Sequence, residues 1–169
     1  MSGRVRVYLG LGSNIDPARH LGEAVAQLRE AFGLITVSRV CRTAPVGFQG
    51  EDFYNLAVGL DTDLDLTTLA ALLRGMEDAA GRFRGGEKFA PRTLDVDVLT
   101  YGALARAEPS ALPRADILEY AFVLGPLADI APDERHPVLG TTYGELWAAF
   151  SGPHADFEWI DHFWERDHS

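Results

Sequence analysis

GRFRGGEKFAPRTLDVDVLTY, residues 81–101, joins a polar loop to a segment in which apolar and polar residues alternate. Over residues 93–99 this alternation predicts a β-strand, because successive side chains of a strand point to opposite faces of its sheet. One face of the strand is then apolar, and the other carries Asp95 and Asp97. The two carboxylates are expected to lie about 7 Å apart at Cα.

Two carboxylates on one face favour a bound cation. Like charges repel, and each raises the pKa of the other unless a cation lies between them. Mg²⁺ typically takes one or two protein carboxylates and fills its other positions with waters and phosphate oxygens. Asp95 and Asp97 are therefore the candidate metal ligands. The alternative is an exposed strand with two ordinary aspartates, which the pair alone leaves open.

The loop before this strand reverses the sign of the chain's charge. The whole chain has a net charge of -10, yet the loop places four cations against the single acid Glu87; the cations are Arg82, Arg84, Lys88 and Arg92. Guanidinium groups beside two acids suit a polyphosphate, because arginine grips phosphate oxygens while carboxylates hold the bridging metal. The alternative is a solvated turn whose arginines pair with surface acids. Loop and strand together favour phosphoryl chemistry.

Composition limits the other possibilities. A chain of 169 residues that is 47% hydrophobic predicts one domain, residues 1–169, with its own core. The acidic balance argues against a nucleic-acid partner, and no apolar run reaches membrane-spanning length, so we expect a cytoplasmic protein with no membrane partner. Cys41 is the one cysteine, which excludes an internal disulfide and predicts a small buried side chain.

Five ordered segments carry a resemblance to a known family. They are YLGLGSN (8–14), RTAPVG (42–47), FYN (53–55), the 81–101 stretch with its G-R-x-R and P-R-T-L-D-x-D-V-L patterns, and FVLGPL (122–127) with IAP (130–132). In this order they resemble the 6-hydroxymethyl-7,8-dihydropterin pyrophosphokinases, from about Val5 to Leu146. The family transfers a diphosphate from ATP to the pterin hydroxymethyl group, releasing AMP, in tetrahydrofolate biosynthesis.

Element order and this resemblance together predict an α+β fold. Alternating strands are expected at 5–11, 35–42, 54–62 and 93–99, and amphipathic helices at 17–32 and 66–80, the first capped by Asp16. This is the βαββαβ ferredoxin-like plan, an antiparallel sheet with helices on its faces, followed by C-terminal additions. The extension 151–169 is expected to form a packed amphipathic helix. A monomer or a homodimer is compatible with this plan.

The resemblance also implies roles for individual residues. The catalytic set would be Arg82, Arg92, Asp95 and Asp97, with two Mg²⁺ ions on the aspartates and ATP as co-substrate. The pterin would be bound by Thr43, Val46, Phe53, Asn55, Asp95 and Phe122, and the nucleotide by Arg74, Glu77, Arg84, Lys88, Phe89, Arg92, Val98, Arg114 and Tyr120. The residues themselves support Phe53 and Asn55, since an aromatic ring can stack on a pterin and a buried amide needs partners. Phe53 could instead be core, and Glu77 an exposed helix acid.

The chain departs from the family pattern near residue 114. The family has P-H-P there and an arginine two residues before the phenylalanine of F-V-L, whereas this chain has Pro113-Arg114-Ala115 and then Tyr120. One lost charge-assisted phosphate contact would cost about 1.5–3 kcal/mol. Two alternatives therefore stay open: a divergent paralogue acting on another pterin-like alcohol, and a pterin-binding protein with impaired catalysis.

Overall fold

The computed structural model describes residues 4–44, 51–81, 93–108, 110–152 and 157–164. Its sheet has the strand order β5-β1-β4-β3-β6, with β2 paired to β4, and every pairing is antiparallel. The strands are β1 (Val5–Ser13), β2 (Thr36–Val37), β3 (Val40–Thr43), β4 (Phe53–Thr62), β5 (Asp95–Tyr101) and β6 (Glu158–Ile160). The order of β1, β3, β4 and β5 is that of a βαββαβ sheet, which confirms the α+β prediction.

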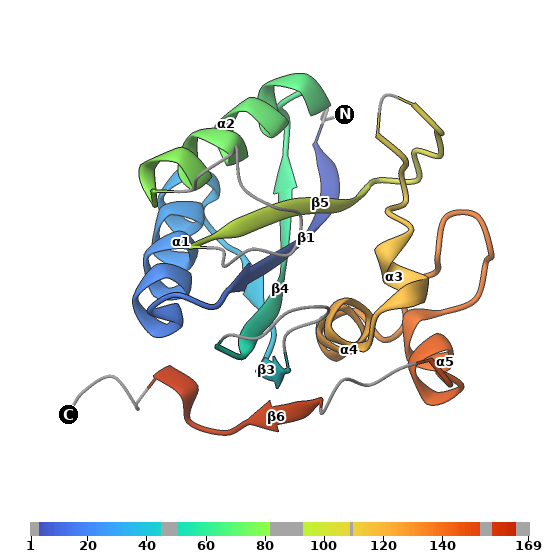
Figure 1. Cartoon of the computed structure of the whole chain (residues 1–169). Helices are drawn as coiled ribbons and strands as arrows, with labels where there is room; N and C mark the ends of the chain where they lie inside the picture. The colour runs from blue at the N-terminus through green and yellow to red at the C-terminus, as the bar shows by residue number, and fades with distance from the viewer. Residues whose placement is uncertain (1–3, 45–50, 82–92, 109, 153–156, 165–169) are drawn as a thin grey trace.

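Helices cover both faces of the sheet (Figure 1). On one face lie α1 (Pro17–Phe32) and α2 (Leu66–Ala79), whose apolar stripes pack on one core cluster together with Leu9 and Leu11 of β1. On the other face lie α3 (Asp116–Glu119), α4 (Ala121–Ile130) and α5 (Tyr143–Ala148), which share a second cluster with Tyr8 and Leu99. The alternation of β1 supplies both clusters, because odd and even positions point to opposite faces.

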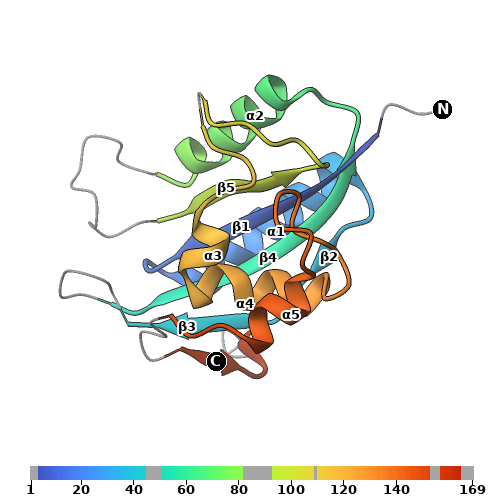
Figure 2. The ribbon, with the colours of Figure 1, turned by 90° about the vertical axis from the view of Figure 1, so that its right-hand side faces the viewer.

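Two sequence-based expectations need correction. The expected strand 35–42 is interrupted at Ser38, whose backbone N–H and hydroxyl both bond to the backbone of Ala57, so it appears as β2 and β3. Over residues 157–164, the described part of the tail beyond Gly152, β6 pairs with β3 along the edge of the sheet instead of forming the expected helix (Figure 2). Without β6, β3 would be an edge strand with unpaired backbone N–H and C=O groups, and the three-residue strand β6 pairs with them.

The tail continues past β6 into the core. Phe163 is buried in the cluster beneath α1, and its ring centroid lies 5.5 Å from that of Tyr54 in β4. Its apolar residues therefore pack as expected, although on a strand and turn. Within the described ranges, no helix has the length and apolar character needed to cross a membrane.

Candidate functional site

Strand register places one row of residues across three strands. Gly12 of β1 lies opposite Asp95 of β5 on one side and opposite Asn55 of β4 on the other. Residues in direct register on neighbouring strands share a face of the sheet, and two strand spacings amount to about 10 Å. Gly12 contributes no side chain to this row, and the Asn55 amide occupies the space above it. The face is the one that carries α3, α4 and α5, since Tyr8, four residues before Gly12, packs there.

Gly12 fixes the position of the Asn55 amide. A Cβ atom on Gly12 would lie 2.4 Å from Asn55 Nδ2, which is closer than van der Waals contact permits. Only glycine therefore allows the amide to occupy this position. Gly12 is not among the site residues predicted from the sequence. The signal was present, because a glycine inside a strand often marks a close approach of another group.

Only one of the two polar atoms of the Asn55 side chain forms a hydrogen bond among the described residues. Its Nδ2 atom donates to the carbonyl of Leu11 at 3.4 Å, while its buried Oδ1 atom has no hydrogen-bond partner among the described residues. A buried acceptor without a partner costs about 1–3 kcal/mol. Asn55 therefore offers an acceptor to any ligand that brings an N–H or O–H group to its Oδ1 atom.

Thr43 and Phe53 flank this amide. Phe53 begins β4 two residues before Asn55, so both side chains leave the same face, and Thr43 of β3 lies directly opposite Phe53. Thr43 is buried, whereas Phe53 and Asn55 are partly exposed. The structure thus brings these three predicted pterin residues together. Val46 lies outside the described residues.

The two aspartates occupy the same face on β5. Asp97 lies opposite Gly10, as Asp95 lies opposite Gly12, and both side chains are partly exposed while Val96 between them is buried on the reverse face. The prediction of a shared carboxylate face is confirmed. Neither Gly10 nor Gly12 places a side chain between these carboxylates and the rest of the row.

Glu77 holds the strand that carries Asp95 and Asp97 from the opposite face of the sheet. It is buried on α2, and its Oε2 atom accepts the backbone N–H of Val96 at 2.8 Å. The interpretation of an exposed helix acid is therefore wrong. Because β5 is an edge strand, this bond satisfies a backbone donor that would otherwise face outward and ties β5 to α2 between the two aspartates. Contact with a nucleotide stays a prediction for Glu77.

Arg114 brings a cation to Asp97. Its backbone N–H donates to the carbonyl of Leu99 at 2.9 Å, which anchors the connecting segment to the end of β5. The guanidinium Nη2 atom lies 4.0 Å from Asp97 Oδ2, and Nε lies 3.5 Å from Asp116 Oδ2 without forming a hydrogen bond. Arg114 therefore reaches the carboxylate face from the position at which the family carries a histidine.

Asp97 is held in an environment that disfavours its charge. Partial burial raises its pKa to about 6; Arg114 lowers the pKa, while Asp95, Glu77 and Asp116 raise it further. A divalent cation would relieve this unfavourable charge. No group of three or more His, Cys, Asp or Glu side chains in the described ranges could hold a metal. The donor set is therefore two carboxylates, which fits Mg²⁺ completed by phosphate oxygens and water.

Tyr120 and Phe122 stand at the start of α4. Tyr120 is the residue between α3 and α4, and its ring stacks on that of Phe122 with centroids 5.0 Å apart and planes inclined by 22°. Both rings are partly exposed. That Phe122 faces Phe53 across a bound pterin stays a prediction.

The remaining nucleotide candidates are less well placed. Arg74 lies on the exposed side of α2, and Val98 packs on the reverse face of the sheet against the core beneath α1 and α2. Five further candidates lie outside the described residues: Arg82, Arg84, Lys88, Phe89 and Arg92. The structure therefore describes the pterin half of the predicted site more fully than the nucleotide half.

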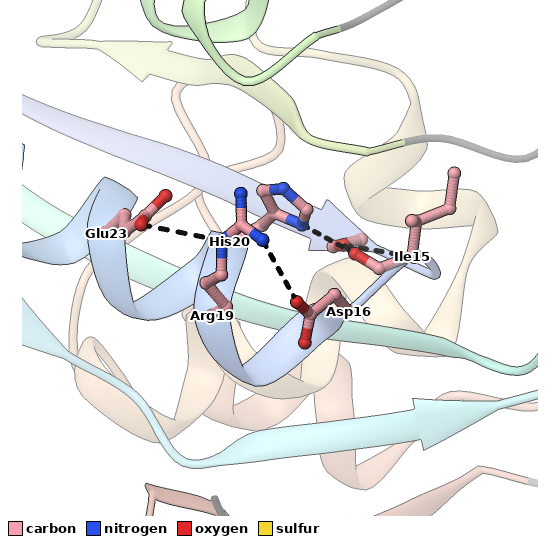
Figure 3. A network of polar contacts seen from close by, with 6 residues as sticks. Ile15, Asp16, Arg19, His20 and Glu23 are labelled. Atoms are coloured by element: carbon pink, nitrogen blue, oxygen red, sulfur yellow. Dashed lines mark hydrogen bonds and ion pairs between the residues drawn. The ribbon is translucent and has the colours of Figure 1, made fainter.

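The turn after Gly12 is held by polar contacts at the start of α1 (Figure 3). His20 is buried and its Nδ1 atom donates to the carbonyl of Ile15 at 2.6 Å. Asp16 has a left-handed backbone and its side chain caps no backbone N–H; it pairs instead with Arg19, which also reaches Glu23. The expected side-chain cap is therefore wrong. The contact of His20 fixes the chain where it leaves β1.

The electrostatics of Asp97 give a direct prediction for the metal-free protein. Replacing Arg114→Met should raise the pKa of Asp97 above 6, because the cation that favours its ionised form among the described residues is lost. A carboxyl-¹³C NMR titration, with Asp97→Asn to assign the resonance, measures this pKa. Arg106→Met, which removes a cation from the same connecting segment, should leave it unchanged.

The sign of the stability change follows from the same pKa. Asp97 binds its proton more tightly in the folded protein than at its ordinary pKa of 3.8, so its contribution to stability should increase as the pH falls from above 6 toward 4. A pKa at or below 3.8 in the unmodified protein would contradict the described environment.

Comparison with known proteins identifies the family. The family model for 7,8-dihydro-6-hydroxymethylpterin pyrophosphokinase matches residues 8–132. A 2-amino-4-hydroxy-6-hydroxymethyldihydropteridine pyrophosphokinase of Methylorubrum extorquens is 45% identical over 133 residues, which cover 76% of this chain and 84% of the relative. The enzyme of the same name from Bacillus subtilis is 37% identical over 154 residues, 86% of this chain and 92% of the relative.

Solved structures confirm the fold. A Plasmodium falciparum HPPK-DHPS crystal structure with pterin and p-hydroxybenzoate matches with a TM-score of 0.68 at 13% identity. The match covers 86% of this chain and 43% of that longer chain, so this chain corresponds to less than half of it. The chain belongs to the 7,8-dihydro-6-hydroxymethylpterin pyrophosphokinase family and is a pyrophosphokinase of folate synthesis.

Proposed function

We propose that the chain transfers a diphosphate from ATP to the hydroxymethyl group of 6-hydroxymethyl-7,8-dihydropterin. The reaction takes place over the row formed by Asn55, Gly12 and Asp95. The observation that carries this proposal is the buried, unpartnered Asn55 Oδ1 atom, two strands from a pair of carboxylates on the same face. A site that binds only phosphate does not need the Asn55 amide, and a site that binds only a heterocycle does not need the carboxylates of Asp95 and Asp97. The combination therefore favours a site that binds both.

The pterin occupies the Asn55 end of the row. Asn55 Oδ1 accepts an N–H from the polar edge of the heterocycle, which removes the cost of the unpaired acceptor. Phe53 and Phe122 supply aromatic faces for stacking, and Thr43 beside Phe53 closes the pocket. Val46 completes this set from the segment after β3. The hydroxymethyl group then points along the row toward Asp95.

The triphosphate occupies the aspartate end. Asp95 and Asp97 hold two Mg²⁺ ions, which supply charge neutralisation and orient the phosphate oxygens. The raised pKa of Asp97 supports this assignment, because an ionised carboxylate in that environment needs a cation. Arg82, Arg84, Lys88 and Arg92 of the loop contact the phosphates, with Arg74 and Phe89 nearer the nucleoside.

In the transfer step the pterin hydroxyl oxygen attacks the β-phosphorus of ATP. The bond from that phosphorus to the oxygen bridging the α- and β-phosphates breaks, and AMP leaves. Asn55 and the stacked aromatic rings hold the acceptor in line, while Arg82 and Arg92 offset charge on the phosphate oxygens. Most of the rate increase then comes from positioning and electrostatics.

Arg114 supplies the positive charge in the segment around residue 114, where this chain departs from the family pattern. Its guanidinium lies on the aspartate side of the row, at 4.0 Å from Asp97, and can move from this weak contact to an ATP phosphate. Retention of this cation and of both aspartates favours a working enzyme over a pterin-binding protein with impaired catalysis.

The proposal predicts loss of AMP release when the carboxylate pair is broken. Asp97→Asn should lower the rate of AMP formation from ATP, Mg²⁺ and the dihydropterin by about 100-fold, or about 2.7 kcal/mol of activation free energy. Asp116→Asn is the matched control, since it also removes a carboxylate from Arg114 but not from the proposed metal ligands; its rate should stay within about threefold. A rate for Asp97→Asn within a factor of about three of the unmodified enzyme would contradict the metal assignment.

Gly12 provides a separate test of the pterin end. Gly12→Ala should raise the dihydropterin KM about tenfold or more, because the new Cβ displaces the Asn55 amide, while the ATP KM changes little. Gly10→Ala in the same strand is the control: its Cβ meets only the Leu99 methyl groups, at 3.3 Å, and these can move. Equal effects of the two substitutions on the dihydropterin KM would count against the role of Asn55.

A further inference from the structure

The aromatic pair at the start of α4 does not fit a nucleotide contact. Tyr120 stands where the family carries an arginine, yet its ring stacks on Phe122 at 5.0 Å rather than standing free toward a phosphate. We infer that Tyr120 is a positioning residue that holds the Phe122 ring ready to stack on the pterin. This inference rests on the proposed function, because Phe122 is assigned there to the pterin end.

The backbone around Tyr120 is fixed on both sides. Its N–H donates to the carbonyl of Asp116 at 3.0 Å, and its own carbonyl accepts from Val123 and Leu124 at 3.1 and 3.0 Å. Leu124 and Ile117 of the two helices are fully buried. Tyr120 therefore cannot shift without disturbing the junction of α3 and α4.

This junction explains why residues two apart can stack. Side chains at positions i and i+2 of a helix do not face each other. Tyr120, however, precedes α4 with an extended backbone of φ -126° and ψ 128°, while Phe122 lies in the first turn. The extended residue turns its ring back over the helix start, so the stack follows from the position of Tyr120 at the helix boundary.

The surroundings of Tyr120 also disfavour a phosphate. Asp116 and Glu119 are the acids of the short helix that leads to it, and a tyrosine side chain brings no cation to a phosphate. Among the described residues its hydroxyl makes no hydrogen bond, and its ring contact is with Phe122. The ring, rather than the hydroxyl, is the part of Tyr120 that interacts.

A stacked neighbour limits the rotation of the partly exposed Phe122 ring. A ring that is already oriented loses less conformational freedom when the pterin stacks on it, which favours binding. Tyr120 should therefore affect the affinity for the flat heterocycle through Phe122 and leave the affinity for ATP unchanged.

A double-mutant cycle on the full chain tests this inference. The variants are Tyr120→Leu, Tyr120→Phe, Phe122→Leu and the Tyr120→Leu/Phe122→Leu double. We expect Tyr120→Leu to raise the dihydropterin KM about five- to tenfold with little change in kcat or in the ATP KM, and Tyr120→Phe to retain the original value. The double variant should be no worse than Phe122→Leu alone, because Tyr120 acts through that ring.

Equilibrium binding of the dihydropterin, with Mg²⁺ and α,β-methylene-ATP present, should follow the same order, and thermal midpoints identify any loss of folding. Effects of Tyr120→Leu and Phe122→Leu that simply add would overturn the inference, as would a rise in the ATP KM with the dihydropterin KM unchanged. If Phe122→Leu itself leaves dihydropterin binding unchanged, the proposed pterin site is wrong. An effect of Phe122→Leu without one of Tyr120→Leu overturns the role of Tyr120 alone.

Discussion

The register of β1 against its two neighbours is the constraint on which the site depends. It sets Asp95, Gly12 and Asn55 in one row and Asp97 beside Gly10 in the next. A slip of one residue would turn either partner strand's polar side chains to the opposite face. Leu9 and Leu11 prevent such a slip, because they are fully buried beneath α1 and α2 on the reverse face.

The chemistry of the row follows from this geometry and from local charge. Gly12 leaves room for the Asn55 amide and Gly10 for the Leu99 side chain, so the amide extends over β1 toward the strand that carries the aspartates. Glu77 holds β5 from the reverse face through Val96, and Arg114 approaches the carboxylates from the segment after β5. In an otherwise acidic chain, residues 82–92 carry four cations against one acid shortly before the strand that bears Asp95 and Asp97.

Sequence reasoning could find the parts of the fold that depend on periodicity. The alternation of residues 93–99 and the apolar stripe of α1 gave the face of Asp95 and Asp97 and the helix bounds to within a few residues. The tail was misjudged, because its aromatic spacing is compatible with a helix and only the open edge of β3 makes a strand preferable. A glycine inside a strand indicates that some group approaches closely, but only the register of β1 against β4 identifies that group as Asn55.

The central claim is that Asp95 and Asp97 hold the cations beside an acceptor bound at Asn55. A crystal structure with Mn²⁺, α,β-methylene-ATP and 6-hydroxymethyl-7,8-dihydropterin tests this most directly, because the anomalous signal of manganese locates each metal ion. We expect manganese peaks within coordination distance of both carboxylates, and the heterocycle between Phe53 and Phe122 with an N–H directed at Asn55 Oδ1. Manganese bound away from Asp95 and Asp97 would contradict the claim, and so would a pterin bound elsewhere.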